Sequence, residues 1–144
     1  MSKIKTQLLI AYIGENIAGG FYLKLAEINA QEPKLVERFK VTAGDEIRHG
    51  EYFNLAHEEV FGSRLKYRKQ LLWLGKVLGF IGKVVSREKL LRVIVKGEHT
   101  AVVALEKELA SQKENGSPSN PYLEVVERIL PDERAHAEPY HGWI

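Results

Sequence analysis

Apolar residues in this chain recur every three or four positions over long intervals, and this spacing constrains the fold more than any other feature. No interval shows sustained alternation of period two, and no Asn-Gly or Asp-Gly pair separates two alternating segments. A spacing of three and four is typical of amphipathic helices, whereas strands alternate. The sequence therefore predicts an all-α protein.

Few helix-breaking residues interrupt these intervals. A chain of 144 residues has the size of one domain and is too short for two ordinary cores, so we expect a single domain over residues 1–144. The predicted helices cover residues 4–28, 33–60, 86–113 and 120–138, and a partly helical segment, 64–83, links the second to the third. Four helices with one long crossover fit a four-helix bundle.

Three residues mark helix limits or interruptions. Pro33 suits the first turn of the second predicted helix, and Ser86 is a candidate N-cap for the third. Pro131 lies inside the last predicted helix and should kink or split it, because proline lacks the backbone donor and clashes with the preceding turn.

Every predicted helix has a glutamate within its apolar stripe, and two stripes also contain a histidine. The stripes are Leu8, Tyr12, Glu15, Ala18, Tyr22 and Leu25; Leu35, Phe39, Thr42, Glu46, His49, Phe53, Ala56 and Val60; Leu91, Ile94, Glu98, Ala101 and Leu105; Tyr122, Val126, Ile129, Glu133, His136 and Tyr140. Four carboxylates in one core would repel one another as well as lose their hydration. Something positive must lie between them.

No lysine or arginine falls on these stripes at the same level, and the chain has no cysteine, which excludes disulfides, thiolate zinc sites and iron–sulfur clusters formed by this chain alone. Two divalent ions would supply +4 against four carboxylates, and a nitrogen and oxygen donor set suits iron or manganese. In "DEIRHGEYF" (45–53) and "DERAHAEPY" (132–140), the three-residue spacing puts Glu and His on one helix face, so that both can bind one ion. The predicted metal ligands are Glu15, Glu46, His49, Glu98, Glu133 and His136.

The remaining titratable residues near these positions are assigned as follows. Tyr12, one turn before Glu15, is interpreted as a core aromatic residue that could also support the ligands or take part in redox chemistry. Asp45 and Asp132 each precede a predicted ligand, and because adjacent helical residues point apart, we expect them at the surface. The other histidines are off the stripes and are expected to face solvent: His57, His99 and His141.

The order Glu, Glu-x-x-His, Glu, Glu-x-x-His resembles the ferritin-like di-iron superfamily over nearly the whole chain. The stretches "GENIAGGFY", "DEIRHGEYF", "KGEHTAVVALEKEL" and "DERAHAEPY" look most like its rubrerythrin-like (erythrin) branch. The segment "LLWLGKVLGF" followed by "KGEHTA" is similar to the ferritin-like domain of vacuolar-iron-transporter-type proteins. The resemblance implies two iron ions, reduction of H2O2 or O2 as a peroxidase or ferroxidase, an electron donor still to be identified, and a homodimer.

Two departures from the rubrerythrin pattern leave other functions open. There is no cysteine-rich rubredoxin-like domain, and Ile94, Val95, Ala101 and Val102 stand where an extra glutamate would neighbour Glu98, which argues against the ligand-switching peroxidase mechanism. The ligand set and long crossover also resemble demethoxyubiquinone hydroxylases, so one alternative is a di-iron hydroxylase at a membrane surface. The other is an iron-binding or delivery module without turnover.

Positive charge is concentrated in residues 64–96, where ten bases accompany a single acid, Glu88. The segment could bind an anionic membrane or an acidic partner; the plainer interpretation, which we favour, is a crossover whose apolar side covers the bundle. No motif predicts nucleic-acid binding. No stretch approaches the roughly 18 uncharged residues of a membrane span, and no signal peptide is recognised, so we expect a cytoplasmic protein.

Overall fold

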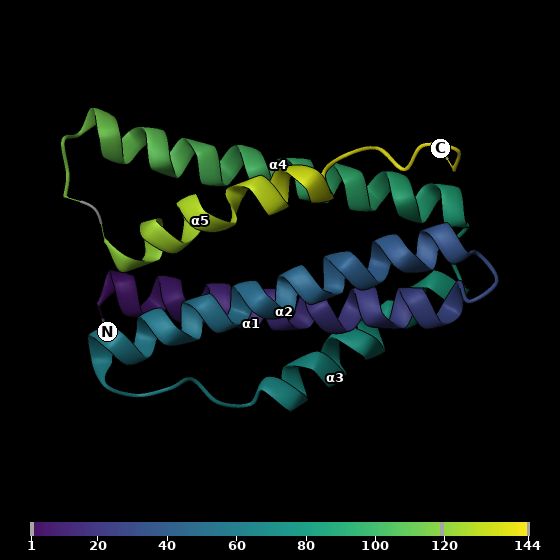
Figure 1. Cartoon of the computed structure of the whole chain (residues 1–144), viewed down its shortest axis with the longest axis horizontal. Coiled ribbons are helices and arrows are strands. Elements are labelled where there is room, and N and C mark those ends of the chain that lie inside the picture. The colour runs from purple at the N-terminus through teal and green to yellow at the C-terminus, as the bar shows by residue number, and fades with distance from the viewer. Residues whose placement is uncertain (1, 119, 144) are drawn as a thin grey trace. The chain divides into compact units, whose positions relative to one another are not determined.

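The computed structural model describes residues 2–118 and 120–143, and every regular element in that part of the chain is a helix. The elements are α1 (Lys3–Ile28), α2 (Pro33–Phe61), α3 (Arg68–Gly79), the 3-10 helix η1 (Phe80–Lys83), α4 (Arg87–Glu114) and α5 (Pro121–His136) (Figure 1). The all-α prediction is confirmed, and the predicted limits of the four long helices differ from these by at most two residues. Among the described residues, no helix combines the length and the hydropathy needed to cross a membrane.

The chain divides into two compact units, Met1–Val84 and Val85–Ile144. The first unit contains α1, α2, α3 and η1, and the second contains α4 and α5. Each unit has fully buried apolar side chains of its own, such as Leu25 and Phe39 in the first and Leu91 and Val126 in the second.

In the first unit, α1 and α2 run antiparallel and side by side (Figure 1). The side chain of Ser2 caps α1 by accepting a hydrogen bond from the Lys5 amide at 3.2 Å. Pro33 starts α2, where its missing donor costs nothing, and Gly62 ends it with φ of 73°, a conformation that glycine adopts without strain. The ring centroids of Tyr22 and Phe39 lie 6.0 Å apart, so the apolar stripes of the two helices meet as predicted.

The segment between α2 and α3 is tied back to α2 by two buried polar residues. Nδ1 of His57 lies 2.6 Å from the Ser63 carbonyl oxygen, and the Leu65 amide donates to Oδ1 of Asn54 at 2.6 Å. His57 is only 3% exposed, so the prediction that it faces solvent is wrong. Its burial depends on the path of the chain after α2, which helical periodicity does not reveal.

Glycines bring α3 into backbone contact with α1. A Cβ atom built on Gly75 would lie 1.9 Å from the Ile17 carbonyl oxygen, and one built on Gly20 would lie 1.9 Å from the Leu72 carbonyl oxygen. Only residues without a side chain permit this approach at these positions.

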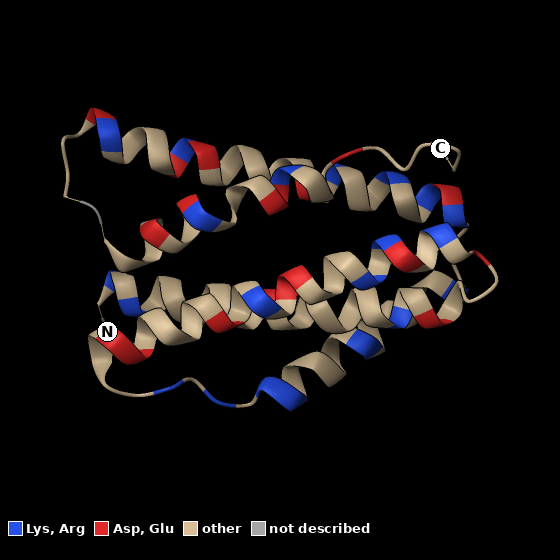
Figure 2. Cartoon of the chain, viewed as in Figure 1, with Lys and Arg blue, Asp and Glu red and all other residues tan. Residues whose placement is uncertain are grey.

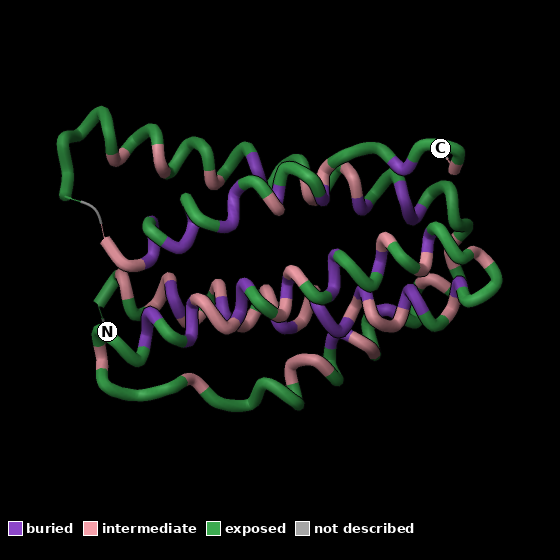
Figure 3. The backbone as a smooth tube through the Cα atoms, in the orientation of Figure 1, coloured by how far each residue is buried: buried purple, intermediate pink, exposed green. Residues whose placement is uncertain are grey.

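The segment that contains α3 and η1 is basic in composition and largely exposed. Figure 2 shows lysine and arginine along this part of the chain, and residues 60–87 contain no aspartate or glutamate. Trp73 and Phe80 are exposed, as is most of the segment in Figure 3. The interpretation that the apolar side of the crossover covers the bundle is therefore wrong for Trp73 and Phe80. The side of α3 that contains Gly75 and Gly79 packs against α1 instead.

In the second unit, α4 and α5 run antiparallel (Figure 1). Ser86 caps α4 as predicted, accepting from the Lys89 amide at 3.4 Å, and Asn120 caps α5, accepting from the Leu123 amide at 2.9 Å. The helix α5 continues through Pro131 to His136, so the alternative that this proline splits the helix is wrong.

Two residues assigned to the apolar stripes are exposed instead. Val60 is in the last turn of α2, and the spacing that places it on the stripe does not tell whether another element reaches that turn. Ala101 is exposed while Val102 is buried. Ala101 and Val102 both lie within about one turn of Glu98, and a helical period of 3.6 residues is compatible with the burial of either residue.

Candidate metal centre

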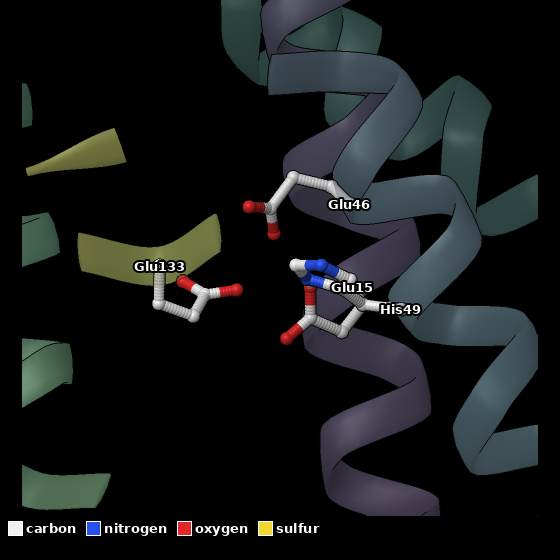
Figure 4. A group of neighbouring side chains, drawn as sticks. All are labelled: Glu15, Glu46, His49 and Glu133. Atoms are coloured by element: carbon white, nitrogen blue, oxygen red, sulfur yellow. Dashed lines mark ion pairs between the residues drawn. The ribbon is translucent and has the colours of Figure 1, made fainter. Parts of the chain in front are cut away.

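Three predicted ligands come together in the first unit. Glu15 of α1 and Glu46 and His49 of α2 each offer a ligand atom, and these atoms lie within 4.8 Å of one another. Oε2 of Glu15 is 3.6 Å from Nδ1 of His49. Figure 4 shows the three side chains converging from the two helices. We call Glu15, Glu46 and His49 the first half-site.

The local structure of α2 explains this convergence. Glu46 and His49 are three residues apart, so they project from one face about one turn from each other. Both are buried, with His49 completely inaccessible, while Glu15 is half-buried. Glu46 and His49 therefore lie on the buried face of α2, as predicted, and the assignment of all three residues as metal ligands stays a prediction.

The second unit contains a matching set. Glu98 of α4 and Glu133 and His136 of α5 also offer ligand atoms within 4.8 Å of one another. Nδ1 of His136 lies 3.8 Å from Oε2 of Glu133. Glu133 and His136 are buried and Glu98 is half-buried. We call these three residues the second half-site.

The donor atoms of the two half-sites fit iron or manganese. Each half-site combines two carboxylates with one imidazole, a set of oxygen and nitrogen donors that suits these metals. Two carboxylates placed close together in a poorly solvated site repel each other unless a cation or a proton intervenes. A divalent ion bound by each half-site would neutralise its two carboxylates.

Asn16, which the sequence analysis did not single out, packs between α1 and α2 beside the first half-site. It is 1% exposed, and its Nδ2 donates to the Tyr12 carbonyl oxygen at 2.8 Å. A Cβ atom on Gly50 would lie 2.8 Å from the same nitrogen, so the asparagine fits only against a glycine. In the sequence, the polar Asn16 follows Glu15 and Gly50 follows His49. These two positions were the signal from which the contact could have been found.

Tyr12 is a buried aromatic residue, as predicted. Its side chain is 2% exposed, and burial raises the pKa of its hydroxyl above the ordinary value of 10.0, opposed by the nearby Arg68 guanidinium. The phenol is therefore protonated at neutral pH. The suggested role in supporting the ligands or in redox chemistry stays a prediction.

The two aspartates that precede predicted ligands are not fully at the surface. The carboxylate of Asp45 is 16% exposed and accepts from Nη2 of Arg48 at 2.8 Å, and Asp132 is half-buried. The surface prediction is thus only partly right. His99 and His141 are exposed as expected.

The family model for rubrerythrin matches residues 7–143, a range that contains all six predicted ligands. No curated protein and no solved structure gives a significant match. The family match confirms the ferritin-like, rubrerythrin-like resemblance, and members of that family typically bind iron. The finer similarity to the ferritin-like domain of vacuolar-iron-transporter-type proteins stays a prediction.

Proposed function

The chain belongs to the rubrerythrin family, and from this membership and the two half-sites we propose that it is a di-iron oxidoreductase that reduces H2O2 or O2. We further propose that residues 1–144 form one ferritin-like domain in which both half-sites contribute to one two-metal centre. The observation that carries the proposal is the matched composition of the half-sites, each with two carboxylates and one imidazole.

Charge and ligand number support a centre built from both half-sites. Each half-site offers three ligand residues, so an iron ion held there would keep coordination positions for a small ligand. Together the half-sites would supply four negative charges, and two divalent ions would balance them. The open positions would accept the oxidant.

When bound, two Fe(II) ions would supply the two electrons that, with two protons, convert H2O2 into two waters. The side chains hold and tune the site. The carboxylate of Glu15 lies 3.6 Å from the imidazole of His49, close enough for both groups to bind the same ion. The buried phenol of Tyr12 remains protonated at neutral pH and could supply a proton or a hydrogen atom.

Electrons must come from outside the chain. The sequence contains no cysteine, so it has no rubredoxin-type iron site to deliver them. We propose that a separate reductant restores Fe(II) between turnovers.

The test is to load the metal-free protein anaerobically with two Fe(II) per chain and to mix it with H2O2 or with O2 in a stopped-flow instrument. We expect oxidation with at least one oxidant to be much faster than that of free iron. The variants E46Q and E133Q should lose this reaction, since each removes a negative ligand from one half-site. A matched control is E127Q, which changes an exposed glutamate of α5.

Two results would contradict the proposal. Oxidation no faster than that of free iron would exclude an oxidoreductase with these oxidants, and reversible release of the iron to a chelator would then favour the delivery module. Full activity of E46Q and E133Q would show that the half-sites are not where the iron reacts.

A further inference from the structure

Exposed apolar side chains gather on one short segment of the chain. Among the described residues, seven of the fourteen exposed large apolar side chains fall within positions 73–84. They are Trp73, Leu74, Val77, Leu78, Phe80, Ile81 and Val84, and we call them the α3 apolar face. Exposed apolar patches of this kind mark sites of interaction with a protein or a membrane.

The first unit cannot cover this face with its own helices. The helix α3 contacts α1 through Gly75 and Gly79, whose Cβ atoms would clash with Ile17 and Lys24. Trp73 and Val77 are four residues apart and project from the side away from these glycines, and Trp73 is 65% exposed. The backbone contact on one side thus leaves the other side directed outward.

Positive charge accompanies the α3 apolar face along its whole length. Residues 60–87 contain seven bases and no acid: Arg64, Lys66, Arg68, Lys69, Lys76, Lys83 and Arg87. Lys69 and Lys76 lie about two helical turns apart on one side of α3, and Lys83 follows at the end of η1. We call these three residues the row of lysines. The ammonium groups of Lys24 and Lys83 lie 4.7 and 5.1 Å from the Phe80 ring centroid, so two cations lie beside this exposed aromatic ring.

We propose that the α3 apolar face binds the surface of an anionic lipid bilayer, with α3 and η1 lying in the plane of the headgroups. Apolar residues with a tryptophan on one side and a row of lysines beside them are typical of interfacial helices. A second copy of the chain fits less well, because a symmetric contact would bring the lysines of the two segments against each other, and the nearby acids Glu51 and Glu58 already pair with Arg64. The proposal does not depend on the iron centre.

The test is flotation of the full-length protein with vesicles of phosphatidylcholine alone or mixed with phosphatidylglycerol. We expect binding only to the anionic vesicles, weakened at high salt because exposed charges are screened. In the variant W143F, Trp73 is the only tryptophan, and its emission should shift to shorter wavelength on binding.

Two variants separate the contributions, with circular dichroism to verify that each is folded. K69Q/K83Q should weaken binding roughly 25-fold, about fivefold for each lysine near the surface. W73S/L78S should abolish it, whereas I10S/V41S, which changes two exposed apolar residues outside this segment, should leave it unchanged.

Three outcomes would overturn the proposal. The first is absence of binding to anionic vesicles at low salt, and the second is equal binding by wild type and W73S/L78S. The third is a dimer of the wild type in sedimentation experiments that is lost in W73S/L78S, together with absence of vesicle binding. The last outcome would assign the face to a second copy of the chain.

Discussion

Oε2 of Glu15 on α1 lies 3.6 Å from Nδ1 of His49 on α2, so the first half-site depends on the pairing of two helices. The imidazole is inaccessible to solvent, and the carboxylate that faces it is half-buried. A metal ion bound there would be held by residues from both helices, and the loss of either ligand should weaken the site.

Replacement of His49 should lower the metal content. We expect H49A to retain about one iron ion per chain instead of about two, because it removes the only imidazole of the first half-site and leaves the second intact. Elemental analysis after anaerobic loading and gel filtration measures the ratio. H99A is the matched control, since His99 is exposed on α4, and it should keep the wild-type ratio. An unchanged ratio in H49A would exclude His49 as a ligand.

Replacement of Gly75 should destabilise the first unit. The added Cβ would overlap the Ile17 carbonyl oxygen, so α3 must move away from α1, at a cost of about 1–3 kcal/mol in the free energy of unfolding. Urea denaturation of G75A measures it. In the control G44A the new methyl group meets no atom within 4 Å, and stability should rise by about 0.5–1 kcal/mol because alanine favours the helix. Equal stability of G75A and wild type would show that the α1–α3 contact is not close.

Tyr12 should make the protein less stable at high pH. Burial raises its pKa above 10.0, so above about pH 10 the folded state binds more protons than the unfolded state. The free energy of unfolding then falls as pH rises. Denaturation series between about pH 8 and pH 11 should show a smaller fall in Y12F than in wild type. The control Y67F, which changes an exposed tyrosine, should follow the wild-type curve, and the same behaviour in Y12F would contradict the prediction.

If both half-sites of a metal centre come from the same chain, a chain with a defective first half-site and a chain with a defective second half-site cannot restore each other's activity. We expect E46Q and E133Q, unfolded together and refolded as a mixture, to remain inactive. Exchange of units between two chains would instead restore about a quarter of the wild-type sites, since half of the dimers would be mixed and each would contain one intact centre. Activity and metal content of the mixture, compared with each variant refolded alone, distinguish the two arrangements.

Much of this protein follows from periodicity alone. The spacing of apolar residues predicts four long helices within two residues of their observed limits, because a helix repeats every 3.6 residues whatever it packs against. The same spacing assigns Glu46, His49, Glu133 and His136 to buried faces, where the structure places them. Residue type then restricts the chemistry, since carboxylates and imidazoles without cysteine select metals that bind oxygen and nitrogen.

Periodicity shows which face of a helix is buried, but it does not show which other segment of the chain packs against that face. His57 is buried because the chain returns along α2 through Ser63, and Trp73 is exposed because Gly75 turns the other side of α3 toward α1. Such contacts join residues through space, and each depends on loop paths and on the distance between two helix backbones. The sequence by itself therefore determined the helices and the ligand types, whereas only the tertiary structure decided that Glu15 meets His49, that Glu98 meets Glu133, and that an apolar face with a row of lysines is left exposed.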